Sequence, residues 1–494
     1  MRLRLILALG LGLVLPLAFA PFHAAWLVPL VLAALFLCWH RQPPRHAAWL
    51  GYAFGLGFFG VGVSWVQISI HQFGLPLYSF SVSMTALFVA FMALYPALAG
   101  WLAARLPARS EAWRLGALMP AVWLLVEWTR GWLFSGFPWL VLGDSQTDGP
   151  CRGFLPLLGA QGTSLVLALS GGGLAIALVR RSQRPLPWLV LAVVPVMLGP
   201  LLARIEWTAP DGPPQGIAIV QGAVPQAEKW SPEYRAGTLD RYATLTEPLW
   251  GAAAIVWPET ALPAFPQEIP EFIAAIEARA RTSGTALLLG LPTSGDAQRY
   301  YNSLVVLGDH EARYSKHHLV PFGEYLPFDA QLRPLLDFLS IPMSSFSAGE
   351  ERQSTLDVGT LRFGATICYE DAYASEVTKT LPRANVLVNV SNDAWFGDSA
   401  APHQHLQIAR VRALEAGRPL VRATNTGISA LIDHDGRVLE RTRQFEPATL
   451  TGTITPRRGI TPFIRTGPWP ALATSILLLL AGCRRLGSKF VPAA

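Results

Sequence analysis

Three short segments of the sequence each carry one reactive side chain directly after an apolar, strand-like stretch. Glu259 lies in VWPETALP, Lys316 in YSKHHLVPFGEYLP and Cys368 in GATICYEDAY. These residue types suit attack on a carbonyl group, because a rigid carboxylate is a plausible general base, a thiol can be presented as a nucleophile, and a fixed ammonium group can lower the pKa of a thiol and stabilise an oxyanion in acyl transfer. The three residues are therefore candidate catalytic residues.

Each candidate also has an ordinary structural interpretation when it is considered alone. Glu259 could be a surface residue at a strand end, Lys316 a solvated lysine and Cys368 an inert core residue, as free cysteines often are. The prolines on both sides of Glu259 stiffen the chain, and the polar residues Tyr369 and Glu370 follow Cys368 at once. These neighbours favour the functional interpretation.

No metal ion or cofactor is expected at these segments. His317 and His318 follow Lys316, but the sequence has no HExxH pattern there and no third ligand at a suitable spacing. The four cysteines, at positions 38, 151, 368 and 483, form no CxxC pair, so neither a zinc site nor a disulfide framework is indicated. Only Cys151 and Cys368 are expected to meet water on the same side of a membrane. A disulfide between them is conceivable, and it would remove the free thiol that the proposed chemistry needs.

The composition of the chain predicts that these residues are positioned by a membrane protein. Of the 494 residues only 15% are charged, and the mean hydropathy of +0.34 is too high for a soluble protein. Eight apolar stretches approach the length of about 20 residues that a helix needs to cross the hydrocarbon core. They cover residues 4–20, 24–40, 48–67, 82–104, 115–134, 156–179, 185–203 and 468–483. The first also resembles a secretory signal peptide, but we expect a retained helix because the next apolar stretch follows almost immediately.

The basic residues predict how these helices are oriented. They lie in short clusters between the apolar stretches rather than on one basic face, so the net charge of +6 does not indicate nucleic-acid binding. Because basic residues in short loops favour the cytoplasmic side, eight spans place every cluster there and residues 205–467 on the outer face. The clusters comprise Arg2, Arg4, Arg41, Arg45, Arg105, Arg109, Arg114, Arg180, Arg181, Arg184, Arg484, Arg485 and Lys489.

Residues 205–467 have a different character, since charged residues become common and apolar runs shorten to strand length. Strand-like runs cover 216–222, 252–259, 286–293, 303–309, 362–370 and 385–393, and helical spacing with a final Gly covers 271–284 and 405–417. Alternating strands and helices predict an α/β layered sandwich. The predicted domains are residues 1–204 with transmembrane helices 1–7, residues 205–467 as the catalytic domain, and residues 468–494 as transmembrane helix 8 with a cytoplasmic tail.

Two charged residues and an aromatic loop stand out in the predicted membrane part. Glu127 and Arg130 lie on one helix face and are expected to pair or to face a polar cavity, because charge is unfavourable in hydrocarbon. The loop 131–149, GWLFSGFPWLVLGDSQTDG, suits the membrane interface and could either line a lipid entrance or simply anchor the chain.

The order WPETALP, SKHHLVPFGEYLP and ICYED resembles the Glu-Lys-Cys triad of the nitrilase superfamily over residues 213–455, a superfamily with an αββα sandwich fold. Such a domain before the last of eight spans is similar to the apolipoprotein N-acyltransferase family over nearly the whole chain. Further local matches are KWSP with Trp230, GEYLP with Glu324, and VSNDAWFG at 390–397.

The resemblance implies that Cys368 takes an acyl chain from a phospholipid, expected to be phosphatidylethanolamine, and passes it to the α-amino group of the N-terminal diacylglyceryl-cysteine of an apolipoprotein. Glu259 would then be the general base and Lys316 the oxyanion stabiliser. The residues that would shape the site are Trp230, Glu324, Tyr369 and Glu370. It also implies a multi-pass protein of the bacterial cytoplasmic (inner) membrane, with the catalytic domain facing the periplasm and no cofactor.

Two other functions stay open from the sequence. A membrane-tethered amidase would use the same triad to hydrolyse small amides, with water in place of the amine. A transporter or scaffold with an exported binding domain would not need Cys368 and would carry charged residues along several spans. Few charges lie within the apolar stretches, so transport is less favoured.

Overall fold

The computed structural model describes residues 1–74, 77–180, 185–296, 299–308, 311–326 and 346–483. The chain forms two compact units. One comprises Met1–Gln67, Tyr78–Glu206 and Arg465–Ala494, and the other comprises Ile68–Leu77 and Trp207–Ile464. Five of the basic residues on which the predicted orientation depends lie outside the described residues, namely Arg181, Arg184, Arg484, Arg485 and Lys489.

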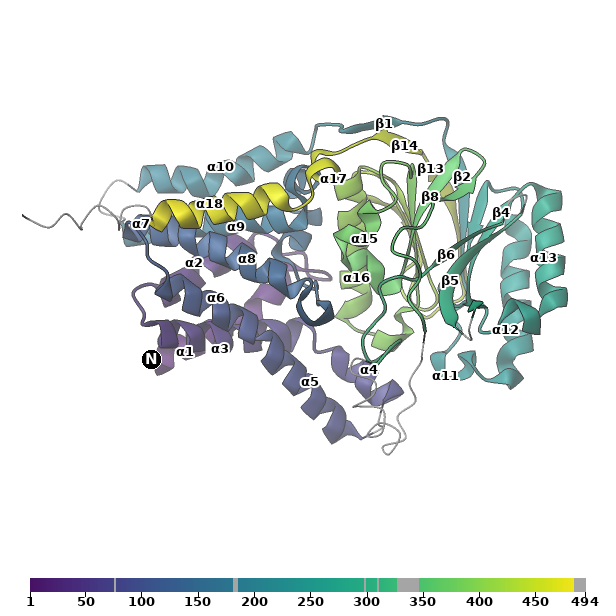
Figure 1. Cartoon of the computed structure of the whole chain (residues 1–494), viewed down its shortest axis with the longest axis horizontal. Helices are drawn as coiled ribbons and strands as arrows, with labels where there is room; N and C mark the ends of the chain where they lie inside the picture. The colour runs from purple at the N-terminus through teal and green to yellow at the C-terminus, as the bar shows by residue number, and fades with distance from the viewer. Residues whose placement is uncertain (75–76, 181–184, 297–298, 309–310, 327–345, 484–494) are drawn as a thin grey trace, which may run out of the picture. The chain divides into compact units, whose positions relative to one another are not determined.

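The first unit is helical (Figure 1). Its helices are α1 (Arg2–Val14), α2 (Leu27–Trp39), α3 (Pro44–Gly62), α5 (Tyr78–Met92), α6 (Leu94–Arg105), α7 (Glu111–Trp113), α8 (Met119–Arg130), α9 (Leu155–Val179), α10 (Leu186–Leu202) and α18 (Trp469–Cys483). Glycines allow close helix contacts, since a Cβ on Gly12 of α1 would lie 2.1 Å from the Phe54 carbonyl oxygen of α3. Small residues of this kind are typical where membrane helices pack together.

Helix length and hydropathy identify two helical stretches of the described chain that can cross a membrane, Tyr78–Arg105 and Arg152–Val179. A third would be the pair Pro44–Gly62 and Val66–Gln72, which is bent by 58°; its second part lies in α4 (Val66–Phe73). Shorter apolar helices cover Leu27–Trp39, Leu186–Leu202 and Trp469–Gly482. Two or three spans therefore follow from the helices themselves, and eight spans stay a prediction.

The second unit contains two six-stranded sheets. One has the order β13-β2-β3-β4-β5-β6 and the other the order β12-β11-β10-β9-β8-β7. The first sheet consists of β13 (Ala448–Ile454), β2 (Gln215–Gln221), β3 (Ala254–Val256), β4 (Ala286–Ser294), β5 (Tyr300–Leu307) and β6 (Ala312–Ser315). The second consists of β12 (Val438–Arg441), β11 (Ala430–Ile432), β10 (Leu420–Thr424), β9 (Val386–Ser391), β8 (Leu361–Ile367) and β7 (Leu356–Val358). The central strands β2, β3 and β4 pair in parallel, as do β8, β9 and β10. A separate antiparallel pair joins β1 (Thr208–Pro210) to β14 (Arg457–Gly459).

Successive side chains along each strand point to opposite faces of its sheet, and the cores on these faces join two sheets and two helix layers into a four-layer sandwich. Ile217 and Ile219 of β2 share one core with residues of the opposite sheet, such as Val388. Ala218 and Val220, which alternate with them, pack in a second core with residues of the helices α12 (Pro232–Thr246) and α13 (Pro270–Ser283). A third core lies between the other sheet and the helices α15 (Ala374–Thr378) and α16 (Ala400–Ala416). Figure 1 shows these helix pairs outside the two sheets, so the αββα prediction is confirmed.

The predicted elements of this unit coincide with observed ones. The six strand-like runs fall on β2, β3, β4, β5, β8 and β9, and the two helical segments fall on α13 and α16. Gly284 and Gly417 follow those helices with φ of +65° and +61°, a left-handed conformation that Gly adopts without strain at a helix end.

Candidate active site

Glu259 lies in a turn after β3 that is pressed against β4. A Cβ on Gly290 of β4 would lie 2.3 Å from the Pro258 carbonyl oxygen and 2.8 Å from the Cα of Glu259, so the turn can come this close only to a glycine. Oε1 of the buried Glu259 accepts a hydrogen bond of 2.7 Å from Asn302 Nδ2, and Lys316 Nζ lies 3.6 Å from the same oxygen. The carboxylate is therefore held between an amide and an ammonium group.

Lys316 follows β6 immediately, and its side chain is only 1% exposed. Its Nζ lies 2.9 Å from Oε1 and 2.8 Å from Oε2 of Glu324. Burial by itself would lower the pKa of Lys316, but the carboxylates of Glu324 and Glu259 hold that pKa above its ordinary value. Asn302 Nδ2 also lies 3.2 Å from Glu324 Oε1, so the ammonium group is charged at neutral pH and is fixed between two linked carboxylates.

Cys368 joins the end of β8 to a short 3-10 helix, Cys368–Ala372. Its φ of +53° is a left-handed conformation, which costs a residue other than Gly about 1–2 kcal/mol. Burial raises the pKa of the thiol and the charge of Glu259 raises it further, while Lys316 lowers it. The thiol is thus protonated at rest and needs a base to become a nucleophile, and both charged candidates act on it electrostatically.

Glu370 connects the segments that carry Lys316 and Cys368. Its Oε1 accepts hydrogen bonds from the backbone N–H groups of His317 at 2.7 Å and His318 at 2.9 Å. Its Oε2 accepts from the Ile367 N–H at 2.7 Å and from the Tyr314 hydroxyl at 3.0 Å. The carboxylate therefore fixes the distance between the two segments and is fully occupied by the protein.

The other two predicted site residues are aromatic and more accessible. The Trp230 side chain, directly after α11 (Gln226–Lys229), is half exposed. Tyr369 is partly exposed, and its ring centroid lies 5.2 Å from that of Tyr373 and 6.2 Å from that of His318. The structure thus clusters Glu259, Lys316, Glu324, Cys368 and Glu370, whereas Trp230 and Tyr369 keep accessible rings that could meet a substrate.

Two residues of the cluster do not follow from the sequence analysis. Asn302 bridges the two carboxylates, although it precedes the predicted strand 303–309 as an unremarkable polar residue. Lys229 is buried, and its Nζ donates to the backbone carbonyl of Glu259 at 3.2 Å. Burial lowers the pKa of Lys229 to about 8, against the opposing effects of Glu259 and Cys368. The only indication of Lys229 in the sequence is that it precedes Trp230 in the family match KWSP.

The prediction that Cys151 meets water is wrong. Cys38, Cys151 and Cys368 are free and buried, and Cys151 is completely so. The helix α10 covers it, since a Cβ on Gly199 would lie 2.9 Å from the Cα of Cys151.

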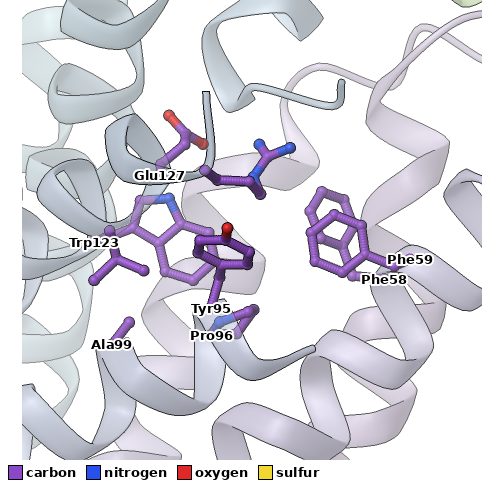
Figure 2. Close-up of a pocket in the computed structure, with 9 residues that line it drawn as sticks. Phe58, Phe59, Tyr95, Pro96, Ala99, Trp123 and Glu127 are labelled. Atoms are coloured by element: carbon purple, nitrogen blue, oxygen red, sulfur yellow. The ribbon is translucent and has the colours of Figure 1, made fainter. Parts of the chain in front are cut away.

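Glu127 and Arg130 line a cavity in the helical unit, and Figure 2 shows Glu127 with the aromatic residues around it. The lining of the cavity is largely apolar and aromatic, and consists of Phe58, Phe59, Tyr95, Pro96, Ala99, Trp123, Val126, Glu127 and Arg130. Arg130 donates to the carbonyl oxygens of Phe137 at 2.7 Å and Leu140 at 3.4 Å, and Glu127 Oε1 accepts from the Leu142 N–H at 3.1 Å. These two side chains therefore bind the backbone of the loop 131–149, a role that the sequence analysis did not predict.

Known proteins resemble this chain over nearly its whole length. Residues 11–173 match the family described as apolipoprotein N-acyltransferase N-terminal domain, and residues 216–460 match the carbon-nitrogen hydrolase family. A Methylococcus capsulatus protein named apolipoprotein N-acyltransferase is 47% identical over 473 residues, which cover 95% of this chain and 93% of that protein. A Nitrosomonas europaea protein of the same name is 42% identical and covers 97% of both chains. A crystal structure of a CN-hydrolase superfamily protein from Xanthomonas campestris is 21% identical and covers 57% of this chain and 100% of its own, with a TM-score of 0.37.

Proposed function

The chain belongs to the apolipoprotein N-acyltransferase family, and we propose that Glu259, Lys316 and Cys368 carry out the acyl transfer by which it acts in lipoprotein maturation. One observation carries the proposal: Lys316 Nζ lies 3.6 Å from Glu259 in a buried cluster whose charges both act on the Cys368 thiol. The relatives are named acyltransferases, which favours transfer over amide hydrolysis and over transport.

In the first step Glu259 accepts the thiol proton while Cys368 Sγ attacks the carbonyl carbon of a phospholipid acyl ester. Lys316 stabilises the negative charge that develops on the carbonyl oxygen. The C–O bond of the ester then breaks, and Glu259 returns the proton to the departing lysophospholipid oxygen. The acyl group is left on Sγ as a thioester.

In the second step the α-amino group of the acceptor attacks the thioester carbon, and Glu259 takes the proton that the amine loses. Lys316 again stabilises the oxyanion. The C–S bond breaks, the proton passes from Glu259 to Sγ, and an amide is released. An amine attacks a thioester readily, so neither step needs a cofactor.

The supporting residues have distinct proposed roles. Glu324 holds the Lys316 ammonium group through two short contacts. Glu370 fixes the two catalytic segments relative to each other through its four hydrogen bonds. The accessible rings of Trp230 and Tyr369 contact the lipid substrates.

The substrates and the membrane arrangement extend this proposal. The donor is phosphatidylethanolamine, and the acceptor is the N-terminal diacylglyceryl-cysteine of an apolipoprotein. Both are anchored in lipid and reach the thiol by lateral diffusion, which agrees with a multi-pass enzyme. Seven spans within residues 1–204 and an eighth within residues 468–483 cross the bacterial cytoplasmic membrane, and residues 205–467 face the periplasm; the distribution of basic residues supports this orientation.

Mass spectrometry of the full-length protein tests the assignment of the nucleophile. After incubation with phosphatidylethanolamine, we expect one acyl adduct that hydroxylamine removes and that peptide analysis locates on Cys368. Cys368→Ala should form no adduct, whereas the matched variant Cys151→Ser should form it normally. Folded wild-type protein without an adduct, or a labile adduct that persists in Cys368→Ala, would contradict the proposal.

A further inference from the structure

A closed ring of four buried charged side chains lies behind Cys368, and neither step of acyl transfer uses it. His405 Nδ1 lies 2.9 Å from Asp393 Oδ1, and His405 Nε2 lies 2.9 Å from Asp371 Oδ1. Arg422 bridges the same two carboxylates, at 3.3 Å from Asp371 Oδ2 and 3.0 Å from Asp393 Oδ2. All four side chains are at most 1% exposed.

The geometry of the ring indicates a charged histidine. Each ring nitrogen of His405 faces a carboxylate oxygen, and only an imidazolium can donate from both nitrogens. Two anions are then balanced by two cations, so the ring has no net charge. Burial and Arg422 lower the pKa of His405, but Asp371 and Asp393 outweigh them and raise it to about 9. Its second proton is therefore retained at neutral pH.

The ring contacts the nucleophile through its backbone. His405 Nε2 lies 3.3 Å from the carbonyl oxygen of Cys368, and Asn389 Nδ2 donates to the same oxygen at 3.2 Å. Arg422 in turn donates to Asn389 Oδ1 at 2.6 Å. This carbonyl belongs to the residue with a φ of +53°, so two donors fix a turn that Cys368 would not adopt alone.

The ring also acts on the thiol. The Ser391 hydroxyl lies 2.9 Å from Asp393 Oδ1 and is a hydrogen-bond partner of the Cys368 side chain, while the charge of Asp393 raises the pKa of the thiol. A ring that lost one of its cations would place an unbalanced negative charge beside Sγ. That charge would oppose formation of the thiolate.

We propose that His405 is a positioning residue for the nucleophile. Its imidazolium holds the Cys368 carbonyl in the left-handed turn and balances Asp371 and Asp393, which would otherwise disfavour the thiolate. This inference rests on the proposed role of Cys368 as the acylated residue. A purely structural histidine would stabilise the fold without influencing the ionisation of the thiol, and this difference can be measured.

The test compares His405→Gln with His403→Gln in the full-length protein. His403 lies on the same helix α16, is partly exposed and contacts Gln444. Two quantities are measured by mass spectrometry: the single-turnover rate of Cys368 acylation by phosphatidylethanolamine, and the pH midpoint of Cys368 alkylation by iodoacetamide. For His405→Gln we expect acylation to slow about tenfold or more and the midpoint to rise by about one pH unit, whereas His403→Gln should match the wild type.

A double variant separates charge balance from simple disruption. Asp371→Asn combined with His405→Gln removes one charge of each sign, so its midpoint should return to within about half a unit of the wild-type value. A folded His405→Gln with wild-type rate and midpoint would overturn the inference, as would a double variant that keeps the raised midpoint. If the wild type itself forms no acyl-enzyme, the proposed function fails instead.

A further measurement applies if His405→Gln does not fold. Acylation by the wild type and by Lys229→Met is then followed from about pH 7 to about pH 10, across the value near 9 for His405; the variant removes the group beside Glu259 whose pKa is about 8. We expect both rates to fall above the His405 value, because the ring becomes negative. A rate that keeps rising through the whole range would overturn the proposal.

Discussion

At the scale of single residues, the charges of the buried Glu259, Lys229 and Lys316 act on the Cys368 thiol, and the partly buried Glu324 pairs with Lys316. Buried charges are tolerated only when they are paired, and Glu259, Glu324, Lys229 and Lys316 are paired with one another or with backbone oxygens. Burial and the charge of Glu259 raise the pKa of the Cys368 thiol, so the proposed mechanism requires proton transfer to Glu259.

Replacing Glu259 with Gln should remove the base while leaving an amide that can still contact Asn302. We expect the single-turnover rate of Cys368 acylation to fall by about 10²–10⁴, the usual contribution of a general base. Glu271→Gln, an exposed acidic position on α13, should leave the rate unchanged. Acylation of Glu259→Gln at the wild-type rate would exclude Glu259 as the base.

Replacing Lys229 with Met should change how stability depends on pH. The pKa of Lys229 is about 8 in the fold, compared with 10.5 for an ordinary lysine, so the unfolded chain binds more protons between these values and stability rises with pH in that range. Burying the charge below about pH 8 costs about 3 kcal/mol, which is absent in Lys229→Met. Unfolding in detergent at about pH 7 and about pH 10 should show a much smaller stabilisation of the variant at the higher pH. Lys379→Met serves as a partly exposed control, and equal stabilisation of Lys229→Met at both pH values would contradict this.

The catalytic candidates could be predicted from the sequence, but their partners could not. Glu259, Lys316 and Cys368 each follow an apolar, strand-like run, and this context distinguishes them from surface residues. Asn302 and Lys229 acquire their importance only because the fold brings them to Glu259. Likewise, His405 is one polar residue of a helical segment until Asp371 and Asp393 meet it from other segments.

At the scale of elements, close packing between a turn and the strand β4 sets the position of Glu259, the proposed base. Gly290→Ala would place a methyl group 2.3 Å from the Pro258 carbonyl oxygen and must displace the turn that carries Glu259. We expect about 1–3 kcal/mol of destabilisation, typical of overpacking, and slower acylation. Gly216→Ala on β2, where a Cβ has no neighbour within 4 Å, is the matched control. Thermal unfolding and acylation rates that are the same for both variants would show that the turn is not constrained by β4.

Six of the inner strands were predictable because they are apolar runs, as expected for strands buried on both faces. The inner strands β10 and β11 were not predicted, although both are fully buried, and neither were the edge strands β6 and β12. β6 contains only Ala312–Ser315 and includes the exposed Arg313, and β12 is largely exposed. Short strands at sheet edges need no apolar pattern of their own, since backbone pairing with a neighbour defines them.

At the scale of the whole molecule, the sequence separates a membrane part from an α/β part, and the structure resolves each as a compact unit. The number of spans is harder to establish because several apolar helices are shorter than a bilayer requires. The side of the membrane on which the α/β unit lies is predicted from the distribution of basic residues in the short loops. This predicted orientation can be tested in a membrane.

Labelling of single introduced cysteines in cells tests on which side of the membrane the α/β unit lies. Glu233 on α12 and His46 near the start of α3 are both exposed, and the orientation rule places them on opposite sides of the membrane. A membrane-impermeant maleimide should therefore label Glu233→Cys in intact spheroplasts and His46→Cys only after lysis, with wild-type protein giving the background. Labelling of His46→Cys before lysis, or protection of Glu233→Cys until lysis, would place the thiol of Cys368 on the cytoplasmic side and remove the topological basis of the proposed function.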